Sequence, residues 1–295
     1  MKRREFIKTS VITTTSVPLS GLFAFSAPSR IPVSKVTGES PFEITKKSVE
    51  LIGGMKKFIS RQDVVMIKPN IGWNRKVEQA ANTNPAVLRA IIEMVFDAGA
   101  KKVILMDNSC HKSEDTYRRS GIQEMVKNSG AELRFSDENR LVIHSFNGEK
   151  LKKWPVFRDH LEVDKFINVP ILKHHSSAGL TIGMKNLYGI IGGRRGKLHR
   201  NMGENIADLA NGFKTDLTIV DAYRILKRNG PVGGKLSDVE IKKTVICSEN
   251  IFEADVVAVD LFGKSIDEVP FIDAGFRRGM GHKDISKINL RTAKI

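Results

Sequence analysis

The sequence has little that would support a metal cluster, a membrane span or a nucleotide-binding loop. It contains two cysteines, Cys110 and Cys247, whereas an iron–sulfur cluster needs four thiolates. No apolar run approaches the roughly 20 residues of a membrane-spanning helix. The glycine-rich segment 189–199 lacks the Gly-Lys-Ser/Thr ending of a Walker loop. We therefore expect two unpaired thiols, no iron–sulfur cluster of its own and a protein that is not an integral membrane protein.

Acidic residues are also few for a chain of this size. The 48 lysines and arginines exceed the 33 aspartates and glutamates, which gives a net charge of +15 at pH 7. A surface of this sign attracts anionic partners such as phosphorylated or carboxylated small molecules. Nucleic acid is the weakest of these candidates, because the sequence has no basic helix, zinc-ligand spacing or aromatic-rich recognition strand. We expect an anionic small-molecule ligand and no nucleic acid partner.

The first residues have the composition of an export signal. Arg3 and Arg4 precede a weakly apolar, Ser/Thr-rich stretch at 9–25 that contains no acidic residue. Paired arginines before such a stretch resemble a twin-arginine (Tat) signal, which the Tat export machinery reads. A basic N-terminus without a targeting role is the alternative. The sequence thus predicts a Tat signal at 1–27, a periplasmic location and one α/β domain at 28–295.

Strand and helix patterns alternate along most of the chain. Short apolar runs predict buried strands at 63–68, 101–106, 131–135, 165–172, 216–220 and 242–247. Apolar residues at helical spacing predict helices at 42–59, 85–97, 115–128, 204–213 and 251–262. This alternation is typical of a Rossmann-like, doubly wound, mostly parallel sheet with helices on both faces. Residues 137–160 break the pattern, and we expect them to form a small excursion or a β-hairpin.

The segment 168–200 carries the densest group of cationic and hydrogen-bonding side chains. We expect strand 165–172 to end where this group begins, and ligands in α/β sheets bind beyond the carboxyl ends of strands. The glycines of the segment allow close approach of backbone N–H groups to a ligand. The sequence therefore predicts an active or ligand-binding centre here. The polar side chains are Lys173, His174, His175, Lys185, Asn186, Tyr188, Arg194, Arg195, Lys197, His199 and Arg200.

Several short motifs, in a specific order, resemble one known family. They are Val65–Asn70, Pro170–His175, Met184–Gly189, Ile219–Ala222 and Gly230–Gly233. The order and content of these motifs are similar to those of the DUF362 family, named as a domain of unknown function. The resemblance implies no defined activity. Some members carry an additional ferredoxin module, and this chain departs from them because it has too few cysteines.

Nine side chains are candidates for the site. We expect one basic cleft, formed where strands end near Asn70, Asp107, Lys173 and Asp221. Lysines and backbone N–H groups would hold a phosphate or carboxylate, and a histidine would act as general acid or base. The candidate catalytic residues are Lys173, His175, Lys185 and His199. The candidate ligand-binding residues are Lys68, Asn70, Asp107, Asn186 and Asp221.

Two other functions fit the same residues. A metal site could use one of the adjacent histidines His174 and His175, together with His199 and a carboxylate. The lysines nearby oppose a cation unless an anionic substrate bridges it. A non-catalytic periplasmic anion-binding protein would need the cationic cleft but no acid and base. The sequence alone does not identify a cofactor, and it leaves these alternatives open.

Overall fold

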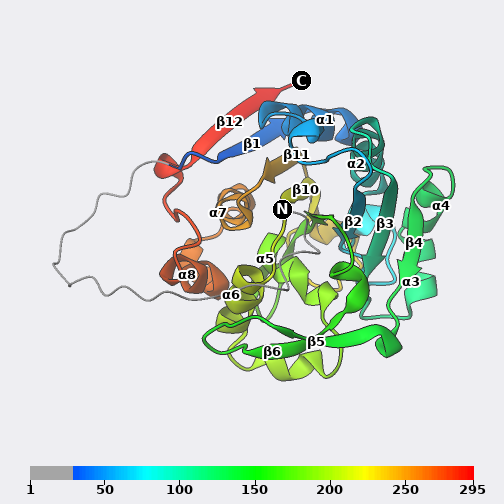
Figure 1. The fold of residues 1–295 in the computed structure, drawn as a ribbon. Coiled ribbons are helices and arrows are strands. Elements are labelled where there is room, and N and C mark those ends of the chain that lie inside the picture. Colours follow the sequence, from blue (N-terminus) through cyan, green and yellow to red (C-terminus); the bar gives the residue numbers. More distant parts are fainter. Residues whose placement is uncertain (1–28) are drawn as a thin grey trace, which may run out of the picture.

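A computed structural model describes residues 29–295, so the expected export signal at 1–27 lies outside the described part. Ten of its strands form one mixed sheet, whose main order is β12-β1-β11-β10-β7-β2-β3-β4 (Figure 1). Two further strands join this order at the side, because β8 pairs with β10 and β9 pairs with β8. The strands of this sheet are β1 (Pro32–Thr37), β2 (Val64–Pro69), β3 (Lys102–Asp107), β4 (Glu132–Phe135), β7 (Lys165–Val169), β8 (Ile171–His175), β9 (Gly179–Thr181), β10 (Leu217–Leu226), β11 (Val239–Ser248) and β12 (Asn289–Lys294).

Most of the strand pairs in this sheet are parallel. Strand β2 runs parallel to β3 and β7, and β7 runs parallel to β10. Strand β11 is antiparallel to both of its neighbours, β1 and β10, and β9 is antiparallel to β8. The predicted mostly parallel α/β fold is therefore confirmed, with antiparallel strands that make the sheet mixed.

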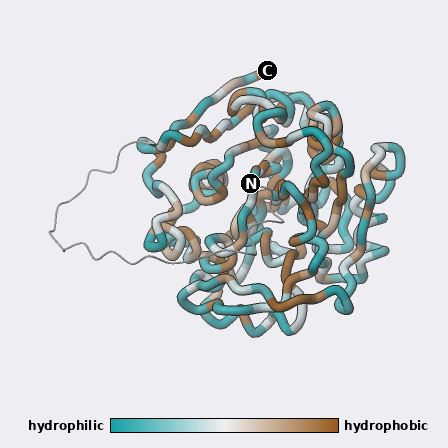
Figure 2. The backbone as a smooth tube through the Cα atoms, viewed as in Figure 1, coloured by the Kyte–Doolittle hydropathy of each residue, from teal (hydrophilic) through white to brown (hydrophobic). Residues whose placement is uncertain are grey.

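Helices cover both faces of the sheet. Helices α1, α2, α3 and α4 pack their apolar side chains into one core, and α5, α6, α7 and α8 pack into a second core on the other face. The tube in Figure 2 is brown along the interior strands and mostly teal at the periphery. The helices are α1 (Pro41–Leu51), α2 (Pro85–Asp97), α3 (Ser113–Arg119), α4 (Ile122–Lys127), α5 (Gly183–Asn186), α6 (Met202–Gly212), α7 (Ile251–Phe262) and α8 (Pro270–Arg277).

The expected excursion at 137–160 is a two-stranded hairpin. Strands β5 (Leu141–Ser145) and β6 (Lys153–Phe157) pair with each other in a separate antiparallel sheet. The hairpin lies at the bottom of Figure 1, beside α6. An isolated β-bridge between Val156 and Ile191 connects it to the segment that carries the predicted site.

Two predicted helices are shorter than expected. The helix predicted at 42–59 ends at Leu51, because Gly53 and Gly54 both have positive φ. The helix predicted at 115–128 is divided into α3 and α4 by Gly121, whose φ is 77°. A residue with positive φ cannot continue a right-handed helix, and glycine adopts that conformation without steric cost.

Two of the predicted strands with candidate residues at their ends continue for several residues beyond their expected ends. The strand predicted at 165–172 is interrupted at Pro170, which has no N–H to donate, and it continues as β8 to His175. Lys173 and His175 therefore lie within a strand rather than beyond its end. The strand predicted at 216–220 continues to Leu226, so that Asp221 lies in its interior.

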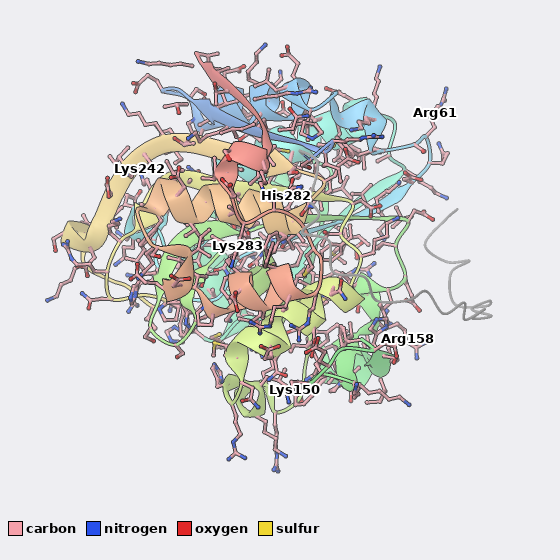
Figure 3. All side chains as sticks on the ribbon, turned by 90° about the vertical axis from the view of Figure 1, so that its left-hand side faces the viewer. Arg61, Lys150, Arg158, Lys242, His282 and Lys283 are labelled. Atoms are coloured by element: carbon pink, nitrogen blue, oxygen red, sulfur yellow. The ribbon has the colours of Figure 1, made fainter. Side chains whose placement is uncertain are left out.

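Basic side chains are spread around the molecule. Figure 3 shows Arg61, Lys150 and Arg158 projecting from different sides, and all three are exposed. No helix within residues 29–295 combines the length and the apolar composition needed to cross a membrane. Exposed basic side chains thus lie on more than one side of the molecule.

Candidate functional site

A cavity of about 510 Å³ lies where β2 and β3 end and where β8, α5 and the turn at 195–199 meet. Strands β2 and β7 are neighbours in the sheet. The chain continues from β2 to β3 on one side of this pair, whereas it continues from β7 towards β10 on the other side. Such a change of direction leaves a crevice at the carboxyl ends of the strands, where α/β proteins bind ligands. The charged and polar side chains of the lining include Lys68, Asn70, Asp107, Lys173, His175, Lys185, Asn186, Tyr188, Arg195 and His199.

Lys68 and Asp107 form a buried ion pair at the base of the cavity. Lys68 Nζ lies 2.7 Å from Asp107 Oδ1, and both side chains are almost fully buried. The carboxylate also accepts hydrogen bonds from the backbone N–H groups of Ile71 and Asn108. Burial lowers the pKa of Lys68, while the adjacent Asp107 opposes that shift. The positive charge of Lys68 is therefore already balanced within the protein.

Gly189 gives this ion pair the space it needs. A Cβ atom at position 189 would lie 2.5 Å from Lys68 Nζ and closer still to Asp107 Oδ1. Real Cβ contacts of that length do not occur, so any larger residue would displace the pair. The expected approach of backbone N–H groups to a ligand stays a prediction, because the groups beside Gly189 are the side chains of the ion pair.

Asn186 links the polar groups of three elements. Its Oδ1 accepts hydrogen bonds from Lys68 Nζ at 3.1 Å and Asn70 Nδ2 at 2.9 Å. Its Nδ2 donates to Asn168 Oδ1 at 2.9 Å. Asn70 Oδ1 in turn accepts from Lys173 Nζ at 2.9 Å. These bonds hold two lysines at fixed positions, and a buried network with satisfied partners is rigid.

Lys173 and Lys185 differ from Lys68 in having no acidic partner within the described part of the chain, residues 29–295. Lys173 Nζ donates to Asn70 Oδ1 and to the carbonyl oxygen of Ala81, and Lys185 Nζ lies 4.1 Å from the centre of the Tyr188 ring. Neither ammonium forms an ion pair with a carboxylate of residues 29–295. Burial lowers the pKa of Lys173 to about 7. Burial, together with repulsion from neighbouring cations, lowers the pKa of Lys185 to about 8.

The two cavity histidines carry the proton of the neutral ring on different nitrogen atoms. His175 Nδ1 accepts hydrogen bonds from the backbone N–H groups of Ser177 and Ala178, so the proton of the neutral ring lies on Nε2. His199 Nδ1 lies 3.1 Å from the carbonyl oxygen of Gly196, which can only accept, so Nδ1 carries the proton and Nε2 is free to accept. Burial and the nearby lysines lower the pKa of His175 to about 3. His175 is therefore a neutral donor, whereas the exposed His199 can act as a base.

Arg195 and Cys110 are among the lining residues that lie outside the nine candidates selected from the sequence. The Arg195 guanidinium donates to the carbonyl oxygens of Asn108, Ser109 and Tyr188, which fixes the loop after β3 against the turn at 195–199. Cys110, a free and exposed thiol, lines the cavity from the same loop. Cys110 could have been selected from its position three residues after Asp107. The loop that follows a strand lies at the same edge of the sheet as the end of that strand.

Asp221 does not line the cavity. Its buried carboxylate accepts hydrogen bonds from the backbone N–H groups of Asn84 at 2.8 Å and Tyr223 at 3.1 Å. Burial raises its pKa to about 6. The expected position at the end of a strand is wrong for Asp221, and its contacts give it a structural role. The other eight selected side chains all line the one cavity, and their roles there stay predictions.

His174 points away from its neighbour His175, as alternating side chains of a strand do. Its Nδ1 accepts a hydrogen bond from the backbone N–H of Gly230, which holds the loop at 229–234. In residues 29–295, no group of three or more His, Cys, Asp or Glu side chains is arranged to hold a metal ion. The donor set of the cavity is rich in lysine and amide groups instead, which suits an anion.

Comparisons with known proteins find chains that are similar in sequence or in structure. It is 26% identical over 242 residues to a thylakoid-associated protein of Synechocystis sp., covering 79% of this chain and 73% of that protein. A solved structure of the lactate racemase apoprotein from Thermoanaerobacterium thermosaccharolyticum aligns with a TM-score of 0.46 and 11% identity. That alignment covers 77% of this chain, which spans only 56% of the other. A protein from Thermotoga maritima aligns with a TM-score of 0.39 and 10% identity, over 80% of this chain and 58% of that one.

The family itself is identified by sequence. The family described as "Domain of unknown function (DUF362)" matches residues 65–260, a span that includes Lys68, Asp107, Lys173 and Lys185. This span covers more than half of the chain. The resemblance of the motifs is thus confirmed, and the chain belongs to the DUF362 family.

Proposed function

We propose that the cavity binds an anionic small molecule through a carboxylate or phosphate group. The observation that carries this proposal is the pair Lys173 and Lys185, two ammonium groups that line one cavity without an acidic partner among the described residues. The remaining buried lysine, Lys68, is already neutralised by Asp107. The pair therefore supplies positive charge that a ligand can balance.

Burial of Lys173 and Lys185 favours the binding of an anion beside them. Charged groups taken out of water are costly unless they are paired, and the protein responds by lowering their pKa. The lowered pKa values of Lys173 and Lys185 reflect this cost. A bound anion would favour the protonated amines, so that binding of the anion is coupled to uptake of protons. Anion affinity should accordingly increase as the pH falls.

Acid/base chemistry on the bound molecule is the second part of the proposal. His199 Nε2 is the free acceptor in its neutral ring, and a lysine with a pKa near 7 exchanges protons readily at neutral pH. His175 would orient the ligand with its Nε2–H rather than remove a proton. A non-catalytic anion-binding protein is the alternative, since it would use the same lysines without a base.

His199→Ala separates the two functions. In an enzyme that uses His199 as a base, the substitution should reduce turnover by about 10²- to 10⁴-fold while the ligand still binds. In a non-catalytic binding protein the same substitution changes affinity alone. Because His199 is exposed, the substitution should leave the core intact, and circular dichroism would check the fold of the variant.

The binding proposal is tested with protein purified from its natural compartment. Native mass spectrometry would detect a retained anion, and a thermal-shift screen of carboxylated and phosphorylated metabolites would find ligands that dissociate during purification. Lys173→Met should lose the stabilisation by the anion. Lys197→Met, which removes an exposed lysine of the same segment outside the cavity, should retain it. Equal stabilisation of both variants would contradict the proposal.

We also propose that the protein is exported by the Tat machinery and acts in the periplasm. The support is the sequence of the first residues, in which Arg3 and Arg4 precede the stretch at 9–25. Such signals are addresses read by a receptor rather than membrane anchors. Export of a folded protein is compatible with a cavity whose walls come from widely separated parts of the chain.

A further inference from the structure

Lys185 is held by a rigid support at the wall of the cavity. It lies in the short helix α5, where Asp255 of α7 accepts hydrogen bonds from the backbone N–H groups of Gly183 at 2.6 Å and Met184 at 2.8 Å. The next residue, Asn186, is fixed by the amide network described above. The backbone on both sides of Lys185 is thus fixed by buried contacts, which positions its side chain.

The three cavity lysines differ in how their amines are occupied. Lys68 is paired with Asp107, and Lys173 donates to two acceptors and is 1% exposed. Lys185 Nζ has no hydrogen-bond acceptor among residues 29–295 and contacts the face of the Tyr188 ring. Among residues 29–295, Lys185 is therefore the cavity lysine whose nitrogen makes no internal hydrogen bond that a covalent bond to a ligand would have to break.

The surroundings of Lys185 also favour the neutral amine. Burial and repulsion from Arg195 and Lys68 lower the pKa of Lys185 to about 8, although the Tyr188 ring favours the charged form. With that pKa, roughly a tenth of the side chain is a free amine at pH 7, far more than for an exposed lysine. Desolvation and neighbouring cations are known ways to activate a lysine as a nucleophile.

We propose that Lys185 forms a covalent imine with an aldehyde or ketone that carries a carboxylate or phosphate group. This inference rests on the proposed anion binding, because Lys173 and its neighbours would hold the charged group while Lys185 reaches the carbonyl carbon. The ligand class is thus narrowed from anions in general to carbonyl-bearing anions such as 2-oxo acids.

The reaction is balanced without an oxidant or a reductant. The lone pair of the neutral amine forms a C–N bond with the carbonyl carbon, and the carbonyl oxygen becomes a hydroxyl group. Both protons of the amine end on the departing oxygen, so that one water molecule leaves and a C=N bond remains. The Nε2–H of His175, which lines the same cavity, is a neutral donor of the kind that can bind the carbonyl oxygen.

Borohydride reduction would trap the imine on the full-length protein. Glyoxylate, an aldehyde with a carboxylate, is the probe, and propanal is its uncharged control. With limiting glyoxylate, intact mass and peptide mapping should show one carboxymethyl group, located on Lys185. Lys185→Arg keeps the positive charge and should lose the adduct, whereas Lys197→Arg should retain it. Propanal should give slower labelling that is spread over exposed lysines.

The outcomes separate this inference from the proposed function. Glyoxylate labelling that is spread over many lysines, or that lies on Lys173, would overturn the assignment of Lys185. Thermal stabilisation by carboxylates without an adduct on Lys185 would overturn the imine and leave anion binding intact. Absence of both stabilisation and adduct would overturn the anion-binding proposal together with this inference.

Discussion

The two histidines of the cavity show how backbone contacts assign chemistry to a residue type. From the sequence, His175 and His199 are both predicted to be catalytic. The backbone N–H groups after His175 make it a neutral donor, and the carbonyl of Gly196 leaves His199 with a free acceptor nitrogen. The presence of two histidines in the site was predictable from the sequence. The nitrogen that carries the proton was not, because it depends on which backbone atoms lie beside each ring.

The absence of a side chain at Gly189 leaves room for the Lys68–Asp107 ion pair. Gly189→Ala would push a methyl group into the Lys68–Asp107 pair, and we expect a loss of about 1–3 kcal/mol of unfolding free energy. Anion binding should weaken as well, since Lys68 would move. Urea denaturation of the variant measures the first effect and ligand titration the second.

Gly196→Ala is the matched control. Gly196 belongs to the same segment and lines the same cavity, but nothing lies within 4 Å of a Cβ at this position. We expect its unfolding free energy to change by no more than about 0.5 kcal/mol. A similar loss in both variants would contradict the idea that the ion pair needs this space.

Among the elements, α5 depends most clearly on a distant residue. Asp255→Ala would remove the acceptor of two buried N–H groups, each of which costs about 1–3 kcal/mol when it is left unsatisfied. We expect lower stability and weaker ligand binding, because Lys185 and Asn186 lie on this helix. Asp260→Ala, at an exposed position on the same α7, should change neither quantity. Unchanged binding in Asp255→Ala would show that α5 holds its position without Asp255.

The sequence predicted the regular elements better than their interruptions. The helix at 85–97 was predicted with its observed bounds, because Pro85 begins it and Gly99 follows it. The break at Gly121 and the continuation of the strand beyond Pro170 were missed. Both features depend on a backbone conformation that the sequence allows but does not require. A glycine can adopt positive φ, and a strand can resume after a proline when a neighbouring strand pairs with it.

At the scale of the whole molecule, the sequence predicted the class of fold and the neighbourhood of the site. Strand ends meet at one edge of a parallel sheet, so Lys68, Asp107 and Lys173 could be placed together from their positions alone. The Lys68–Asp107 ion pair and the hydrogen bonds made by Asn186 could not be predicted from the sequence. Lys68 and Asp107 are 39 positions apart, and Lys68 and Asn186 are 118 positions apart, so that only the packing of the sheet determines that these side chains touch.

Export by the Tat machinery would concern the molecule as a whole. Changing both Arg3 and Arg4 to Lys should retain the protein in the cytoplasm, because the Tat receptor reads the arginine pair. Cell fractionation followed by immunoblotting measures the distribution. Lys2→Arg, which leaves the pair intact, is the control and should be exported normally. Equal export of the double variant would contradict a Tat signal.

The most direct test of the account is the pH dependence of anion binding. Oxalate is a suitable probe for isothermal titration, because it keeps the same charge between pH 6.5 and 9 and changes in affinity then report on the protein. Lys173 and Lys185, with pKa values of about 7 and 8, lose protons across this interval. We predict that oxalate binds the wild-type protein at least about tenfold more tightly at pH 6.5 than at pH 9, and that Lys173→Met reduces both the affinity and its pH dependence. An affinity that is the same at both pH values and in the variant would contradict a cationic anion-binding cavity.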